Sequence, residues 1–208
     1  MKASGLYYVL FVVLVIGGLM FFFKMQREMK KENPRTTDLA TEPDELINTA
    51  GRNLQDHKSK AAIKFLDDAI EIMKILEKDG DSISINAVEI AIYDLEVVEE
   101  HIRAEDINED MMYEAFADAM NSLAYASLRV SEQYTLEGKE KEAKVTLSHA
   151  MEHLQNSIKY ARGDQKEDEI KIVAHLTTII ENHLESDISE IDKVMAEIDS
   201  VVQSHVIQ

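Results

Sequence analysis

The sequence predicts an all-α protein in which an N-terminal transmembrane helix precedes a helical bundle or short solenoid. An uncharged apolar run from Gly5 to Phe23 supports the first part of this prediction. In the rest of the chain, apolar residues recur three and four positions apart, as on one helix face, and no long stretch alternates with the period of two typical of a strand. The 208 residues also include only two prolines, the residue that helix interiors tolerate least.

The apolar run predicts a membrane anchor over residues 5–24, because about 20 apolar residues in a helix span the hydrocarbon core of a bilayer. A cleavable secretory signal is the alternative, but such a signal has a shorter apolar stretch and small residues at its cleavage site. This run ends in three phenylalanines and Lys24, without that site. We therefore expect an uncleaved single-pass signal-anchor after a short tail of residues 1–4.

Basic residues on the two sides of the span predict its orientation, since cytoplasmic flanks are enriched in Lys and Arg. Only Lys2 precedes the span. Five basic residues follow it, namely Lys24, Arg27, Lys30, Lys31 and Arg35. This bias predicts a protein of the cell (inner) membrane with its C-terminal domain in the cytoplasm. The alternative is the opposite insertion, which places the domain on the outer (periplasmic) side.

Residues 42–208 read as one acidic all-helical domain after a basic collar and linker over residues 25–41. Thr41-Glu42-Pro43-Asp44 predicts the first helix start, since threonine caps helix N-termini and proline fits the first turn. Glycines at positions 80, 138 and 163 predict helix ends. We expect about six or seven helices whose apolar stripes face one another.

Two segment pairs in this domain predict an internal duplication. Residues 60–73 and 141–154 share the pattern K-x-A-x3-L-x2-A-[IM]-E-x-[ML] at an offset of 81 residues. Residues 97–102 and 179–184 align in the same order at an offset of 82. Core helices draw on a small set of residue types, so a chance similarity is the alternative.

The duplicated unit would contain three helices. Its two copies are predicted over residues 44–104 and 124–186, with a cap helix over residues 187–206. Sequence self-similarity at a fixed period is typical of folds in which each unit buries its apolar face against the next unit. The acidic charge extends over both predicted copies, so we do not expect it to form one concentrated site.

Four residues around the turn that begins the second copy have a recognisable spacing, namely Tyr134, Gly138, Ala143 and Ala150. With this spacing the chain resembles the tetratricopeptide family over about residues 130–155, with a degenerate copy near residues 50–75. In that family a glycine makes the turn between two helices and alanines let them pack closely. In the degenerate copy His57 replaces the glycine and Asn53 the tyrosine. The resemblance implies a helical-hairpin scaffold that binds other proteins, and it carries no catalytic residue.

The net charge of −18 divides into two opposed parts. Residues 1–32 hold five basic and two acidic side chains, whereas residues 33–208 hold 17 basic and 38 acidic ones, a net charge of −21. This balance excludes a nucleic-acid binder, since phosphate binding depends on clustered Lys and Arg. The absence of cysteine excludes disulfides, zinc ribbons, iron–sulfur clusters and thiol catalysis.

Three pairs of side chains are candidate metal ligands, and we expect none of them to bind a metal or other cofactor. The two histidines at positions 149 and 153 have the i, i+4 spacing of zinc-binding histidines but lack a third ligand, so we expect a solvated or boundary pair. The other two pairs have the pattern Glu-x-His. Their side chains point about 200° apart on a helix and cannot share an ion. The pairs are His149 with His153, Glu99 with His101, and Glu181 with His183.

Four soft apolar residues near the start of one predicted helix are candidates for partner binding, namely Met111, Met112, Tyr113 and Phe116. Methionine and aromatic side chains suit adaptable binding surfaces. The alternative is that they belong to the core, because they also have helical spacing.

These observations predict a membrane-anchored helical adaptor, scaffold or accessory subunit rather than an enzyme, since no catalytic motif is present. Its expected partners are other proteins, either membrane-associated or with basic surfaces, and the membrane itself. The sequence leaves open whether the protein forms a homo-oligomer. The alternative function is a membrane-tethered sensor or a metal- or ligand-binding bundle, and a hydrolase or redox enzyme is a third.

Overall fold

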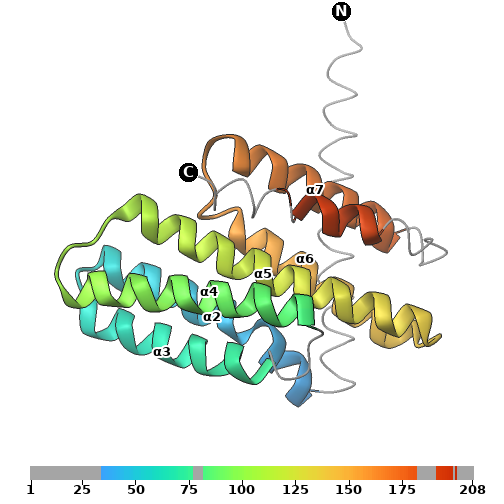
Figure 1. Cartoon of the computed structure of the whole chain (residues 1–208), viewed down its shortest axis with the longest axis horizontal. Coiled ribbons are helices and arrows are strands. Elements are labelled where there is room, and N and C mark those ends of the chain that lie inside the picture. Colours follow the sequence, from blue (N-terminus) through green and yellow to red (C-terminus); the bar gives the residue numbers. More distant parts are fainter. Residues whose placement is uncertain (1–33, 77–81, 182–190, 199, 201–208) are drawn as a thin grey trace, which may run out of the picture. The chain divides into compact units, whose positions relative to one another are not determined.

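The computed structural model describes residues 34–76, 82–181, 191–198 and 200, and all the regular structure in these residues is helical (Figure 1). The predicted all-α fold is therefore confirmed for this part of the chain. A further helical segment covers residues 191–198. The labelled helices are α2 (Pro34–Gln55), α3 (Ser59–Leu76), α4 (Ser82–Arg103), α5 (Glu109–Leu136), α6 (Glu140–Ser157) and α7 (Gly163–Glu181).

The chain divides into two compact units, residues 1–38 and 39–208, and all side-chain contacts named below belong to the second unit. Among the described helices, none combines the length and apolar character that a membrane crossing needs. The predicted tail over residues 1–4, the anchor over 5–24 and the first part of the collar, up to residue 33, lie outside the described residues.

Helix α2 begins at Pro34, so the predicted helix start at Thr41 is wrong. Pro43 lies inside the helix rather than in its first turn. Proline removes one backbone N–H from the hydrogen-bond ladder, but a helix can continue past it. Asp44 consequently is not a helix-terminal acid, and its side chain is fully buried between helices.

Helices α2 and α3 form one hairpin and helices α5 and α6 another, and the two turns have the same geometry. His57 and Gly138 both have positive φ angles, 59° and 71°. In each turn the amide of the next residue donates to the carbonyl five residues earlier, at 2.7 Å and 2.8 Å. The predicted turn at Gly138 is thus confirmed. Gly163 instead begins α7, and Gly80 lies outside the described residues.

The buried positions of the two hairpins coincide at the predicted offset of 81 residues. Four positions of α3 and their four counterparts in α6 have no solvent-exposed surface. Their small and large apolar side chains alternate along the face on which each helix packs. The positions are Ala62, Leu66, Ala69 and Met73 in α3, and Ala143, Leu147, Ala150 and Leu154 in α6.

The buried positions of α4 and α7 also coincide, at an offset of 81 residues. This offset is one fewer than the 82 residues at which the sequences 97–102 and 179–184 align. The buried residues are Ala91, Leu95 and Val98 in α4, and Ile172, Leu176 and Ile179 in α7. In this register Glu99 corresponds to Ile180 and His101 to residue 182, so the repeated Glu-x-His letters do not occupy equivalent positions. The duplication itself stays a prediction that this packing supports.

Helix α5 is central to the packing, because it contacts both α4 and α6, while α3 contacts α4 and α6 contacts α7 (Figure 1). One continuous apolar core joins α2, α3, α4 and the first half of α5. Phe116 is its largest fully buried side chain. The first hairpin therefore shares its core with α4 and with the first half of α5, the helix that begins the second hairpin.

The two turns give a matched test of backbone strain. A residue with a Cβ atom costs about 1–2 kcal/mol in the left-handed region, and part of this cost is offset because glycine has a more flexible unfolded state. We expect His57→Gly to raise the free energy of unfolding by about 0.5–1 kcal/mol and Gly138→Ala to lower it by about 1 kcal/mol. Urea unfolding followed by circular dichroism measures both; a loss of stability in His57→Gly would contradict the shared geometry.

Candidate functional site

An open groove of about 670 Å³ lies between α2 and the C-terminal end of α6, and we call it the α2–α6 groove. Its walls are polar and aromatic, and α5 contributes one tyrosine. The lining residues are Glu45, Asn48, Thr49, Arg52 and Gln55 from α2, Tyr113 from α5, and Glu152, Asn156, Lys159 and Tyr160 from α6 and the residues after it.

One wall of the groove depends on a glycine in α2. A Cβ atom added at Gly51 would lie 3.1 Å from the hydroxyl oxygen of Tyr160 and 3.4 Å from the Phe116 ring. The absence of a side chain at Gly51 thus lets the Tyr160 ring lie against the α2 backbone. Tyr160 also makes an edge-to-face contact with Phe116, with ring centroids 5.3 Å apart. Burial raises the pKa of Tyr160 to about 12, so its hydroxyl stays protonated.

A chain of hydrogen bonds, which we call the Asp44 network, joins α2 to α6 beneath this groove. The buried Asp44 carboxylate accepts from Nδ1–H of His153 and from Nδ2–H of Asn156, each at 2.8 Å. Asn156 Oδ1 accepts from Asn48 at 3.3 Å, and Asn48 Oδ1 accepts from the Tyr160 hydroxyl at 2.9 Å. A buried carboxylate needs such donors, because unpaired burial of a charge is costly.

Two of the groove-lining residues, Tyr113 and Tyr160, belong to a cluster of aromatic and cationic side chains. The guanidinium of Arg162 lies 4.5 Å from the centre of the Tyr113 ring, close enough for a cation–π contact. Tyr113 also contacts Tyr160, with ring centroids 5.7 Å apart. Tyrosine and arginine are the residue types most often found at the energetic centres of protein interfaces.

The four predicted partner-binding residues lie at different depths. Phe116 and Met112 are buried in the core, and Met111 and Tyr113 pack against it while remaining partly exposed. Only Tyr113 lines the α2–α6 groove. The remaining lining residues come mainly from α2 and α6 and carry no sequence motif, so the helical pattern alone could not identify them.

The candidate metal ligands are held apart by other contacts. Glu99 binds Arg103 at 2.8 Å, and Nδ1 of His101 contacts the carbonyl oxygen of Asp106 at 3.1 Å. Glu181 is exposed, and His183 lies outside the described residues. Across the described ranges, no three His, Cys, Asp or Glu side chains are grouped so that they could hold a metal ion.

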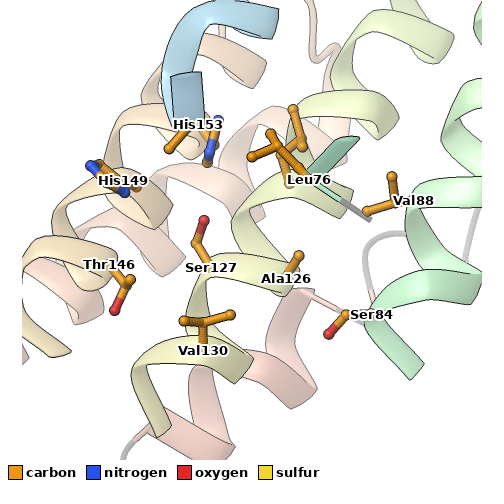
Figure 2. Close-up of a pocket in the computed structure, with 11 residues that line it drawn as sticks. Leu76, Ser84, Val88, Ala126, Ser127, Val130, Thr146, His149 and His153 are labelled. Carbon is orange, nitrogen blue, oxygen red and sulfur yellow. The ribbon is translucent and has the colours of Figure 1, made fainter. Parts of the chain in front are cut away.

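His149 and His153 are both buried, so the expected solvated or boundary pair is wrong. His153 belongs to the Asp44 network. His149 lines a second, mostly apolar cavity of about 170 Å³, which we call the His149 cavity (Figure 2). Burial, with a smaller effect of neighbouring His153, lowers the pKa of His149 to about 4, so its imidazole is neutral at pH 7. Its Nε2 atom is buried and has no hydrogen-bond partner.

A largely buried acid that the sequence patterns did not single out lies on α5. Burial, with smaller effects of the nearby carboxylates of Glu114, Asp94 and Glu169, raises the pKa of Asp118 to about 7. These acids come from α5, α4 and α7 respectively. Glu169 is itself buried, where it accepts hydrogen bonds from Asn121 at 2.9 Å and Ser157 at 2.7 Å. Asp118 thus titrates near neutral pH where these helices meet.

No protein family, curated protein or solved structure matches this chain. The inferences about its site therefore depend on the geometry and chemistry of its own residues.

The raised pKa of Asp118 predicts that the free energy of unfolding of the domain depends on pH. Its pKa in the folded chain lies above the ordinary value of 3.8, so the folded state binds more protons between about pH 4 and pH 7. Its contribution to stability is therefore fully present below pH 4 and is lost as the pH rises through 7. Asp118→Asn, which cannot ionise, should raise the free energy of unfolding at pH 8 by on the order of 2–4 kcal/mol.

Urea unfolding of the wild type and Asp118→Asn at pH 4.5, 6 and 8 measures this difference. The gain should shrink steadily toward the lowest pH. Asp164→Asn on α7 is the control, because Asp164 is exposed. A gain of equal size at all three pH values would show that the substitution acts through packing and would contradict the assigned titration.

Proposed function

We propose that the protein is a single-pass membrane-anchored helical adaptor or accessory subunit that binds a segment of a partner protein in the α2–α6 groove. The observation that carries the proposal is the groove itself, whose walls come from both helical hairpins. A site that needs two hairpins is typical of scaffolds that bind proteins along stacked helices.

The groove lining suits a polypeptide segment. Gln55 presents an amide group, which can both donate to and accept from a peptide backbone, while the amides of Asn48 and Asn156 are held in place by the Asp44 network. Tyr113 adds an aromatic ring to the lining, and Arg162 stacks on this ring. Polar adaptable contacts around a few aromatic anchors are characteristic of interfaces that recognise loops and extended segments.

Charge adds a preference for the partner. The groove contains Arg52 and Lys159 beside Glu45 and Glu152, so its lining is balanced, although residues 33–208 carry a net charge of −21. The acidic surroundings favour capture of proteins with basic surfaces, most strongly at low salt. They also repel anionic lipid, which would keep the domain away from the headgroups.

The membrane part of the proposal depends on the sequence of residues 5–24. A tether restricts the domain to the membrane surface and so raises its effective concentration toward other membrane components. The basic residues that follow the run favour a cytoplasmic domain at the cell (inner) membrane. A topology reporter fused to the C-terminus of the full chain distinguishes this orientation from the periplasmic one.

The groove is tested by site-specific photo-crosslinking of the full chain in cells. A photoreactive amino acid at Gln55 should form adducts with a defined set of proteins identified by mass spectrometry. The same group at Tyr93, which is 65% exposed on α4 outside the groove, is the position control. Equal adducts from both positions would contradict recognition in the groove.

A charge reversal tests the same site in a second way. Lys159→Glu should lower the yield of the Gln55 adducts about tenfold or more, since a hydrogen bond to a charged group contributes about 1.5–3 kcal/mol. Lys64→Glu makes the same change of charge on the exposed face of α3 and should leave the yield nearly unchanged. Parallel losses in both variants would mean that net charge, rather than the groove, governs the association.

A further inference from the structure

The two walls of the α2–α6 groove run in the same direction, so the groove has two distinct ends. At one level Asp44 of α2 accepts a hydrogen bond from His153 of α6, at 2.8 Å. Farther along both walls Tyr160 lies against Gly51 and donates to Asn48, at 2.9 Å. One end of the groove is therefore level with the pair Asp44 and His153, and the other end is level with the pair Gly51 and Tyr160.

Charges of opposite sign gather at these two levels. The chain neighbours of the first pair, Glu45 and Glu152, line the groove and form what we call its acidic end. The chain neighbours of the second pair, Arg52 and Lys159, also line the groove and form what we call its basic end. On α2 the two ends are separated by two helical turns, a rise of about 10 Å. Each end takes one side chain from each wall, so a bound segment meets two like charges at either end.

Both cations of the basic end bond to neutral oxygen atoms. The guanidinium of Arg52 donates to Thr49 Oγ1 at 2.9 Å, and the Lys159 ammonium donates to Asn156 Oδ1. The other arginines whose side chains the structure describes bind carboxylates instead, namely Arg103, Arg129 and Arg162. Arg52 is thus an exception in a domain rich in acids. Its guanidinium is exposed and is available to a carboxylate of a bound segment, which arginine can hold through two parallel hydrogen bonds.

The acidic end offers the complementary contact. Glu45 is exposed, and Glu152 is half-buried on the facing wall. A lysine or arginine side chain between them would offset the repulsion of two like charges. A segment with charges of one sign would be attracted at one end and repelled at the other, so the lining favours a segment that carries both signs.

We propose that the α2–α6 groove recognises a segment in which one basic and one acidic side chain lie about three residues apart, with the basic one at the acidic end and the acidic one at the basic end. Three residues of an extended segment span about 10 Å. This inference rests on the proposed function, because it specifies the segment that the groove binds. Gln55 and Tyr113 bond to each other beyond Arg52, so the two ends also differ in shape and the order of the two charges along the backbone matters.

Binding of short synthetic peptides to the full chain in lipid nanodiscs tests the proposal, with fluorescence anisotropy as the measurement and empty nanodiscs as the blank. Each peptide of Gly, Ser and Tyr carries one Lys and one Glu, in either order, placed side by side or about three residues apart. One order at the wider spacing should bind about tenfold more tightly than the other three peptides, since a hydrogen bond to a charged group contributes about 1.5–3 kcal/mol.

A charge swap on one wall is the matched variant. Glu45→Arg with Arg52→Glu keeps the net charge and should reduce the difference between the peptides to less than about twofold, because each end then holds one charge of each sign. Lys64→Glu with Glu71→Lys swaps charges over the same two turns on the exposed face of α3, outside the groove, and should leave the preference unchanged. Arg52→Gln alone serves the same purpose if the first swap does not fold, which circular dichroism shows.

Four peptides that bind equally or not at all would overturn the proposal, and so would a preference that survives the swap on α2. The proposed function has a separate readout, the difference between adducts at Gln55 and at Tyr93. Adducts specific to Gln55, together with peptides that bind regardless of their charges, would retain the groove as a binding site and refute the charge pattern alone.

Discussion

The Asp44 carboxylate is the contact on which the two hairpins most depend. It lies on α2, is fully buried, and accepts hydrogen bonds from two residues of α6 more than 100 positions away. Removal of these donors would leave a charge unpaired in the interior, which is among the most destabilising changes that a single substitution can cause. Because His153 also lines the His149 cavity and Asn156 lines the groove, the same carboxylate fixes one residue of each site.

Much of the fold could be predicted from the sequence, because apolar periodicity and turn residues act locally. The hairpin at Gly138 and the buried faces of α3 and α6 follow from such patterns. The start of α2 could not be predicted in this way, since Pro43 and the acids beside it are typical of a helix N-terminus and only tertiary packing carries the helix through them. For the same reason the position of Asp44 was typical of an exposed acid at a helix N-terminus, where the helix dipole favours negative charge, rather than of a buried acid.

The candidate sites were less predictable than the fold, because each brings together residues that are distant in the chain. Tyr113 was identified from its neighbours, but its groove partners on α2 and α6 share no spacing with it. His149 was considered as a candidate metal ligand because of its i, i+4 spacing to His153, although burial gives the two residues different surroundings. A single polar residue within an apolar helix face, as at Asp118 and Glu169, is the signal that could have located the buried polar groups. Whether such a residue is buried or exposed cannot be decided until the facing helix is known.

The close approach at Gly51 has a consequence for how this protein can vary. Glycine in a helix interior costs about 1 kcal/mol relative to alanine, so the usual route to a more stable helix would be to replace it. Here that replacement would push the Tyr160 ring away from α2 and change the width of the opening that it borders. Gly51 thus makes α2 less stable than alanine at that position would. In return, the lack of a side chain at Gly51 lets the Tyr160 ring of the second hairpin lie close to α2 of the first.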